Sequence, residues 1–234
     1  MKISAFSIPG VALGKHNLKD NRLDQIEQIV KPKKKTYVQV ELAGEDAALD
    51  ADAILVLKDS LPDLILKDME FIETRLGKAT EEEEKALLNK LKIILEKEEF
   101  IFNVALSREE KQAISGYSLF TNKPIAVVEK KDLDDLDSLL TRVLREAGFI
   151  SFFTTTGGKE SRAWLIKKGT TAFEAAGVIH SDIQRGFIRA EIISFNDFIQ
   201  SGGETLGKQA GKMRSEQKDY VMQDGDLVNF RFNK

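Results

Sequence analysis

Cysteine is absent from this sequence of 234 residues, and there are only one tryptophan, two histidines and four prolines. The lack of cysteine excludes disulfides, thiol catalysis and cysteine-ligated metal sites. No apolar run approaches the roughly 20 residues that span a bilayer, and the opening residues 1–17 lack the small-residue cleavage site of a secretory signal. We therefore expect a cytoplasmic protein with no membrane partner.

Excess positive charge is also absent, because the formal net charge is -3. Nucleic-acid binders usually carry a clearly basic domain or stripe, so any such role here requires a local patch. The composition, 42% hydrophobic and 31% charged, is that of an ordinary globular chain. Its length allows two domains, each with its own core.

The first part of the chain has the pattern of an α/β domain. TYVQVEL at 36–42 alternates between apolar and polar residues, and AILVL at 53–57 is a continuous apolar run typical of a strand buried on both faces. Apolar residues at helical spacing then predict a helical hairpin at about 62–98, with Pro62 in its first turn. Thr80 and Glu83 have capping-box spacing before its second helix, and the run EEEE at 81–84 suits that helix's first turn.

The last part of the chain has the pattern of a separate α+β domain. SRAWLI, RGFIRAEIISF and DYVMQDGDLVNFRF are rich in β-branched and aromatic residues, which favours strands. Thr171 and Glu174 have capping-box spacing before FEAAGVI, which predicts a short helix between the first two strands. The glycine pair at 157 and 158 predicts the boundary, with domains at 1–156 and 157–234.

These C-terminal residues resemble the TGS domain of the YchF / Obg-like ATPase family. The strings AGVIHSD, RGFIRAE and KDYVMQDGDLVNFRFN follow the family pattern without gaps, and DNRLDQIEQIVKPKK at 20–34 is similar to a further family segment. The resemblance implies a ubiquitin-like β-grasp fold for 157–234 and a P-loop NTPase fold for 1–156. It also implies contacts with RNA or the ribosome.

The N-terminal part departs from the P-loop pattern G-x-x-x-x-G-K-[ST]. In SIPGVALGKHN, Gly14 and Lys15 match the second glycine and the lysine, but Pro9 stands at the first glycine and His16 at the hydroxyl position. Imidazole is a poor substitute for a hydroxyl on Mg²⁺, which prefers oxygen. The motif GVALGK alone is also compatible with a glycine-containing loop whose lysine faces solvent.

Other parts of the implied nucleotide site are altered as well. Glu41 stands where the resemblance places an aspartate that organises magnesium, in a segment that ends at Gly44. Lys123 and Pro124 match the start of the base-reading strand, but the asparagine expected after it is missing, and the first switch segment is absent. We therefore expect a degenerate P-loop domain, no cofactor and no hydrolysis, with residual phosphate binding by Gly14 and Lys15 left open.

A local basic patch in the C-terminal part is the candidate for RNA contact. Its members are Arg185, Arg189, Lys208, Lys212 and Arg214. About 12 basic against 10 acidic residues in 157–234 is also the balance of an ordinary solvated surface. Neither a catalytic residue nor a metal ligand stands out, and a lone His180 before Ser181 and Asp182 is more typical of a capping group.

Three functions remain open. The resemblance favours a non-hydrolytic binding protein that contacts RNA, the ribosome or a translation-associated protein through the TGS domain. The alternative is a switch or weak NTPase that binds ATP or GTP with Mg²⁺ through Gly14 and Lys15. A third is a regulatory module that recognises another protein through the β-grasp surface and the hairpin.

Overall fold

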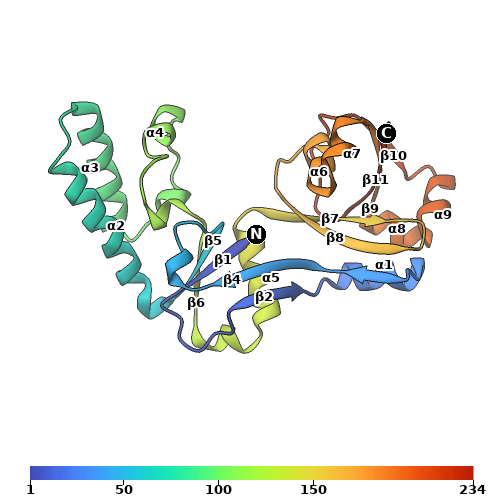
Figure 1. Cartoon of the computed structure of the whole chain (residues 1–234), viewed down its shortest axis with the longest axis horizontal. Helices are drawn as coiled ribbons and strands as arrows, with labels where there is room; N and C mark the ends of the chain where they lie inside the picture. The colour runs from blue at the N-terminus through green and yellow to red at the C-terminus, as the bar shows by residue number, and fades with distance from the viewer. Residues whose placement is uncertain (234) are drawn as a thin grey trace. The chain divides into compact units, whose positions relative to one another are not determined.

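The computed structural model describes residues 1–233, which form two compact units (Figure 1). The N-terminal unit consists of Met1–His16 and Val40–Ala147. The C-terminal unit consists of Asn17–Gln39 and the residues from Gly148 onward. The chain therefore passes between the units three times, which the single predicted boundary at 156/157 did not anticipate.

A five-stranded sheet forms the centre of the N-terminal unit, in the order β2-β4-β1-β5-β6. Its strands are β1 (Lys2–Phe6), β2 (Gly14–Leu18), β4 (Val38–Ala43), β5 (Ala53–Leu57) and β6 (Ile125–Val128). β1 pairs in parallel with both β4 and β5, and β5 pairs in parallel with β6. All five residues of β5 are buried, as expected for a parallel strand covered on both faces.

Four helices belong to this unit: α2 (Leu61–Leu76), α3 (Glu82–Glu96), α4 (Arg108–Ala113) and α5 (Leu136–Glu146). Short 3-10 turns lie at Glu45–Ala47, Lys58–Ser60, Ile101–Asn103, Phe120–Asn122 and Lys130–Asp134. α2 and α3 form the predicted helical hairpin (Figure 1).

The seam of the hairpin is apolar and closed to solvent. Ile72 of α2 and Leu88 and Leu91 of α3 are fully buried in one cluster. The expected capping box at Thr80 and Glu83 is wrong, because α3 begins at Glu82 after an N-cap, Glu81, whose side chain bonds no backbone amide. The acidic run still occupies the first turn, where the helix dipole favours negative charge.

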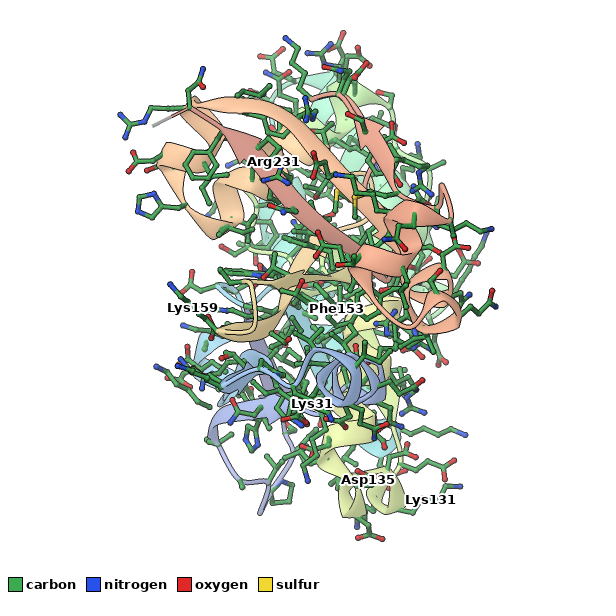
Figure 2. All side chains as sticks on the ribbon, turned by 90° about the vertical axis from the view of Figure 1, so that its right-hand side faces the viewer. Lys31, Lys131, Asp135, Phe153, Lys159 and Arg231 are labelled. Atoms are coloured by element: carbon green, nitrogen blue, oxygen red, sulfur yellow. The ribbon has the colours of Figure 1, made fainter. Side chains whose placement is uncertain are left out.

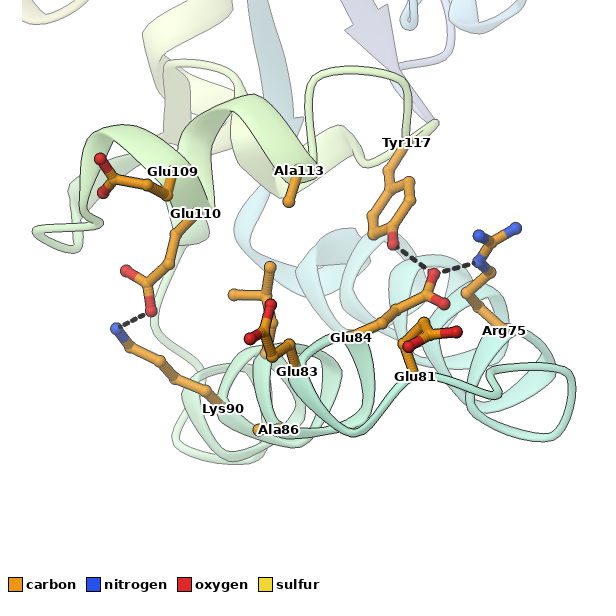
Figure 3. A pocket seen from close by; sticks show the side chains of 11 residues that line it. Arg75, Glu81, Glu83, Glu84, Ala86, Lys90, Glu109, Glu110, Ala113 and Tyr117 are labelled. Carbon is orange, nitrogen blue, oxygen red and sulfur yellow. Dashed lines mark hydrogen bonds and ion pairs between the residues drawn. The ribbon is translucent and has the colours of Figure 1, made fainter.

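A groove of about 770 Å³ lies between α3 and α4 in the N-terminal unit (Figure 3). Glu84 in this groove accepts hydrogen bonds of 2.7 Å from the hydroxyl of Tyr117 and from Nε of Arg75. Lys90 Nζ forms a 2.7 Å ion pair with Glu110 on the opposite wall. These pairs tie α4 and the segment after it to the hairpin.

A six-stranded sheet forms the C-terminal unit, in the order β10-β9-β11-β7-β8-β3. Its strands are β3 (Lys34–Thr36), β7 (Phe149–Thr155), β8 (Glu160–Lys167), β9 (Phe187–Ser194), β10 (Arg214–Glu216) and β11 (Asp226–Phe232). The helices are α1 (Asn21–Val30), α6 (Ala172–Ile179), α7 (Ser181–Arg185), α8 (Phe195–Ser201) and α9 (Glu204–Gln209). β7 runs parallel to β11 and antiparallel to β8, and β9 runs antiparallel to both β11 and β10.

The core of this unit lies between the sheet and α6. Ala172, Ala175 and Ala176 of α6 are buried in one cluster with Phe152 of β7 and Ile192 of β9. Small alanine side chains allow the helix to lie close to the aromatic residues of the strands. α6 begins with the predicted capping box of Thr171 and Glu174, and it lies between β8 and β9 in the chain, as expected.

The observed units differ from the predicted domains for two reasons. β7 precedes the glycine pair, yet it lies between β11 and β8 and so belongs to the C-terminal sheet. Residues 17–39 also belong there, because β3 pairs in parallel with β8 from Lys34 opposite Glu160. Among residues 1–233, the longest and most apolar helices still fall short of what crossing a membrane requires.

Candidate nucleotide site and basic surface

The loop after β1 is the candidate nucleotide site. It runs over residues 7–13 at the carboxyl end of β1, the edge of a parallel sheet where ligands usually bind. Ser7 and Gly10 have positive φ angles of 51° and 77°. With Gly44 and Glu45 from the segment after β4, this loop lines an open hollow of about 450 Å³.

Gly14 and Lys15 lie at the start of a strand. In a P-loop the equivalent residues open a helix, whose N-terminal amides bind the phosphates. Here β2 follows directly, and α1 begins only at Asn21. Gly14 has a φ of 121°, which glycine adopts without strain. The two matched residues are therefore present without the helix N-terminus that makes them a phosphate site.

His16, at the hydroxyl position, is already engaged. Its Nε2 lies 2.8 Å from the carbonyl oxygen of Ala12, within hydrogen-bond distance. An imidazole has no oxygen to offer a magnesium ion, and this ring nitrogen already contacts the loop backbone.

Glu41 does not reach the loop. It pairs in register with Lys2, at the beginning of β1, whereas the loop follows the end of that strand. The carboxylate that does reach the loop is Glu45, which accepts a hydrogen bond of 3.1 Å from Ser7 Oγ. The sequence pattern did not single out Glu45, although its position directly after Gly44 at the end of a predicted strand was the available signal.

Glu45 is also held by a lysine. Lys67 Nζ lies 2.6 Å from its Oε1, and the same ammonium group stands 5.0 Å from the centre of the Phe6 ring. The bond from Lys67 is the main cause that lowers the pKa of Glu45, and the bond from Ser7 adds to it. An ionised carboxylate thus lines the hollow, where phosphate oxygens would need positive charge or amide donors.

Lys123 and Pro124, at the start of β6, have structural partners. Lys123 Nζ donates to the carbonyl oxygen of Ala51 at 2.8 Å, and the carbonyl oxygen of Pro124 accepts from the amide of Ile54 at 2.9 Å. Beyond β6, Glu129 forms a capping box with Asp132. At this edge His16 stands at the position of the P-loop hydroxyl, and the carboxylate of Glu45 lies beside the loop.

The five basic candidates divide into small groups within the C-terminal unit. Their positions are Arg185 at the end of α7, Arg189 on β9, Lys208 on α9, Lys212 after α9 and Arg214 on β10. Arg185 forms an ion pair with Asp182 of the same helix. Its guanidinium therefore has a local partner.

Arg189 and Lys208 both interact electrostatically with the same carboxylate, Glu191 of β9. Arg189 forms an ion pair with Glu191 at 3.1 Å, and Arg231 of β11 forms another at 2.8 Å. The hydrogen bond from Arg231 is the largest cause that lowers the pKa of Glu191, and the charge of Lys208 also contributes. Glu191 thus offsets part of the positive charge of this group.

Lys212 and Arg214 are near a second carboxylate, Asp197 of α8. Lys212 Nζ lies 3.3 Å from Asp197, whose pKa is lowered first by a bond from Ser194 and then by Lys212. Arg214 pairs with Glu216 at 3.1 Å. Four of the five predicted cations therefore have a carboxylate partner, and only Lys208 forms no ion pair within the described chain.

The fold defines a mixed α/β protein whose N-terminal sheet contains parallel strands. The structure of the Schizosaccharomyces pombe YchF GTPase has a similar fold, with a TM-score of 0.79 at 19% identity over 99% of this chain and 97% of that one. The family model YchF-GTPase_C, described as a protein of unknown function (DUF933), matches residues 149–233.

Curated relatives agree with the structural match. The "Ribosome-binding ATPase YchF" of Bacillus subtilis is 32% identical over 236 residues, covering 73% of this chain and 64% of that protein. The protein of the same name from Haemophilus ducreyi is 36% identical over 203 residues, covering 64% and 56%. These matches show that the chain is similar to the YchF family along most of its length. It spans between about half and two thirds of the length of these two relatives.

Proposed function

We propose that this chain is a non-hydrolytic binding protein of the YchF family that contacts the ribosome or its RNA through the C-terminal unit. The observation that carries the first part is that Gly14 and Lys15 enter a strand instead of a helix. The second part is supported by the names of its relatives, which are called ribosome-binding. Such a role places the protein in the cytoplasm.

The C-terminal unit is assigned in this proposal to the TGS class of β-grasp domains. In support, β7 and β11 are adjacent parallel strands at the centre, flanked by antiparallel β8 on one side and β9 on the other. α6 crosses one face of this sheet and connects β8 to β9 through α7. This combination of a mixed sheet with one packed helix is the arrangement that the sequence resemblance implies.

Loss of hydrolysis follows from charge and geometry at the loop. Phosphoryl transfer depends on positioning and on positive charge around the transferred group. At this edge Lys15 is exposed on β2, and the ionised Glu45 lies beside Ser7. Both features disfavour a bound triphosphate.

Co-sedimentation with purified ribosomal subunits tests the binding half of the proposal. We expect the full chain to pellet with a subunit at about 50 mM salt and to be released as salt rises, because phosphate contacts displace counterions. Lys208→Ala and Lys212→Ala address the predicted patch, and Lys78→Ala, an exposed lysine of the other unit, is the matched control. No pelleting at low salt would remove the ribosome from the proposal.

The alternative of a nucleotide-dependent switch is tested in the same assay. Addition of ATP or GTP with Mg²⁺ is expected to leave the pelleted fraction unchanged. A change in that fraction that disappears in Lys15→Ala would favour the switch instead, since Lys15 is the residue that the alternative requires.

A further inference from the structure

The edge of the C-terminal sheet formed by β3 and β8 carries a second group of cations. Its members are Lys31, Lys33, Lys34, Lys159 and Arg162. The backbone brings them together, because Lys33 N donates to Gly158 O at 3.0 Å and Lys34 N donates to Lys159 O at 3.1 Å. In Figure 2, Lys31 and Lys159 mark the two chain segments that meet at this edge.

Fewer of the cations at this edge form ion pairs with carboxylates than in the predicted patch. Glu160 is the carboxylate on these two strands, and it pairs with Lys34 at 3.4 Å while accepting a hydrogen bond of 2.5 Å from Thr36. The Lys34 side chain remains 70% exposed. Lys31, Lys33 and Lys159 are exposed and form no ion pair with residues 1–233.

Arg162 adds an oriented donor to this edge. Its guanidinium carbon stands 4.0 Å from the centre of the Trp164 ring. The indole is fixed in turn, because its Nε1 donates to Thr154 Oγ1 at 2.9 Å and its ring stacks on Phe152. A guanidinium held over an aromatic ring loses little side-chain freedom when it binds a phosphate or stacks on a base.

We propose that this β3–β8 edge is the RNA-binding surface of the protein, with lysines contacting phosphates and Arg162 contacting a phosphate or a base. This inference rests on the proposed function and changes the location of the contact from the patch around Lys208 and Lys212. Lysines also protect exposed edge strands from pairing with other chains. Protection explains lysines on β3, but it does not require the Arg162–Trp164 stack.

The fluorescence of Trp164 provides a direct measurement of RNA binding at this edge, because Trp164 is the single tryptophan of the chain. The probe is an unlabelled single-stranded RNA of mixed sequence, long enough to cover the edge, titrated into the full chain while tryptophan emission is followed. Binding at the edge is expected to change the emission in a saturable and salt-dependent manner. Emission that stays constant while binding is detected by sedimentation would overturn the inference.

Variants that remove positive charge test which surface binds RNA. The edge triple variant Lys33→Ala, Lys34→Ala and Lys159→Ala is compared with the matched triple Lys208→Ala, Lys212→Ala and Lys218→Ala on the same unit. We expect the edge triple to weaken RNA and ribosomal-subunit binding at least tenfold and to reduce the salt slope by roughly 0.7 for each phosphate that is no longer neutralised. The matched triple is expected to retain affinity within about threefold, because Lys212 is paired with Asp197 and the charge of Lys208 acts on the ionised Glu191.

The outcomes separate the two proposals. If the full chain binds neither RNA nor subunits at low salt, the proposed function fails. If it binds and only the matched triple loses affinity, the edge inference fails and the proposed function stands. Arg162→Lys keeps the charge but not the planar group, so a loss of affinity in this variant supports the stacked role; near-UV circular dichroism checks that each variant is folded.

Discussion

Ser7 Oγ donates a 3.1 Å hydrogen bond to Glu45 Oε2, which joins the first residue after β1 to the segment after β4. In a parallel sheet these two positions face the same ligand edge. This serine–glutamate pair links the loop to the segment after β4. The conformation of the loop is therefore stabilised in part by a side-chain hydrogen bond within the N-terminal unit.

We expect no hydrolysis of ATP or GTP by the full chain. Phosphate release in the presence of Mg²⁺ should match the buffer rate, since the loop lacks the helix N-terminus that would hold the nucleotide. Lys15→Ala should give the same result as the unchanged protein. Multiple-turnover release that is lost in Lys15→Ala would show that the loop is a working site.

Leu91→Ala should destabilise the N-terminal unit by about 2 to 5 kcal/mol, because the leucine is fully buried in the hairpin seam. Ile93→Ala on the same helix is the matched control, since Ile93 is 52% exposed. Its effect should remain within about half a kcal/mol. Urea unfolding followed by circular dichroism measures both, and equal effects would contradict the assigned seam.

Removal of residues 1–156 should leave a fragment that does not fold. The fragment 157–234 lacks β7, the strand between β11 and β8, so two strands that it retains lose their partner. Near-UV circular dichroism and the emission of Trp164 report whether a packed core remains. A native-like spectrum from this fragment would show that β7 is dispensable.

Acid should weaken the C-terminal unit through Glu191. Its folded-state pKa lies below the ordinary 4.5 because Arg231 bonds the carboxylate. The contribution is therefore complete above pH 4.5 and is lost as the pH falls below that value toward the folded-state pKa. Glu191→Gln should lower the free energy of unfolding by about 1 to 3 kcal/mol at pH 7.

The free energy of unfolding of Glu191→Gln should approach that of the unchanged protein as the pH falls. Urea unfolding at about pH 7, 5 and 3 measures the difference across the range in which the carboxylate takes up its proton. Asp219→Asn, at an exposed position of the same unit, is the control and should change stability by less than about half a kcal/mol. A difference for Glu191→Gln that does not shrink in acid would contradict the assigned role of its charge.

Local patterns in the sequence predicted the elements whose partners are near in the chain. The spacing of Leu87, Leu91 and Ile94 predicted a helix that packs on its neighbour, because a stripe of this period requires an apolar partner. The capping box at Thr171 was also predicted and is present, since it depends on residues three positions apart.

Features that depend on distant partners could not be predicted in this way. The segment GKHNL gave no sign that it would be an edge strand, because its pairing with β4 joins residues far apart in the sequence. The glycines at 157 and 158 mark a turn between β7 and β8 and not a boundary between domains. The basic residues were identified from charge alone, and their partners Glu191 and Asp197 became visible only in the fold.

The placement of residues 17–39 in the C-terminal unit has a consequence for synthesis. β3 is made early, but its partner β8 follows roughly 125 residues later, about 6 to 25 seconds at ordinary ribosomal speeds. Until then the KPKKK segment emerges from the ribosome as an unpaired, highly positive stretch. The second unit therefore cannot finish folding until β8 has been synthesised. Until that point β3 must remain unpaired in the nascent chain.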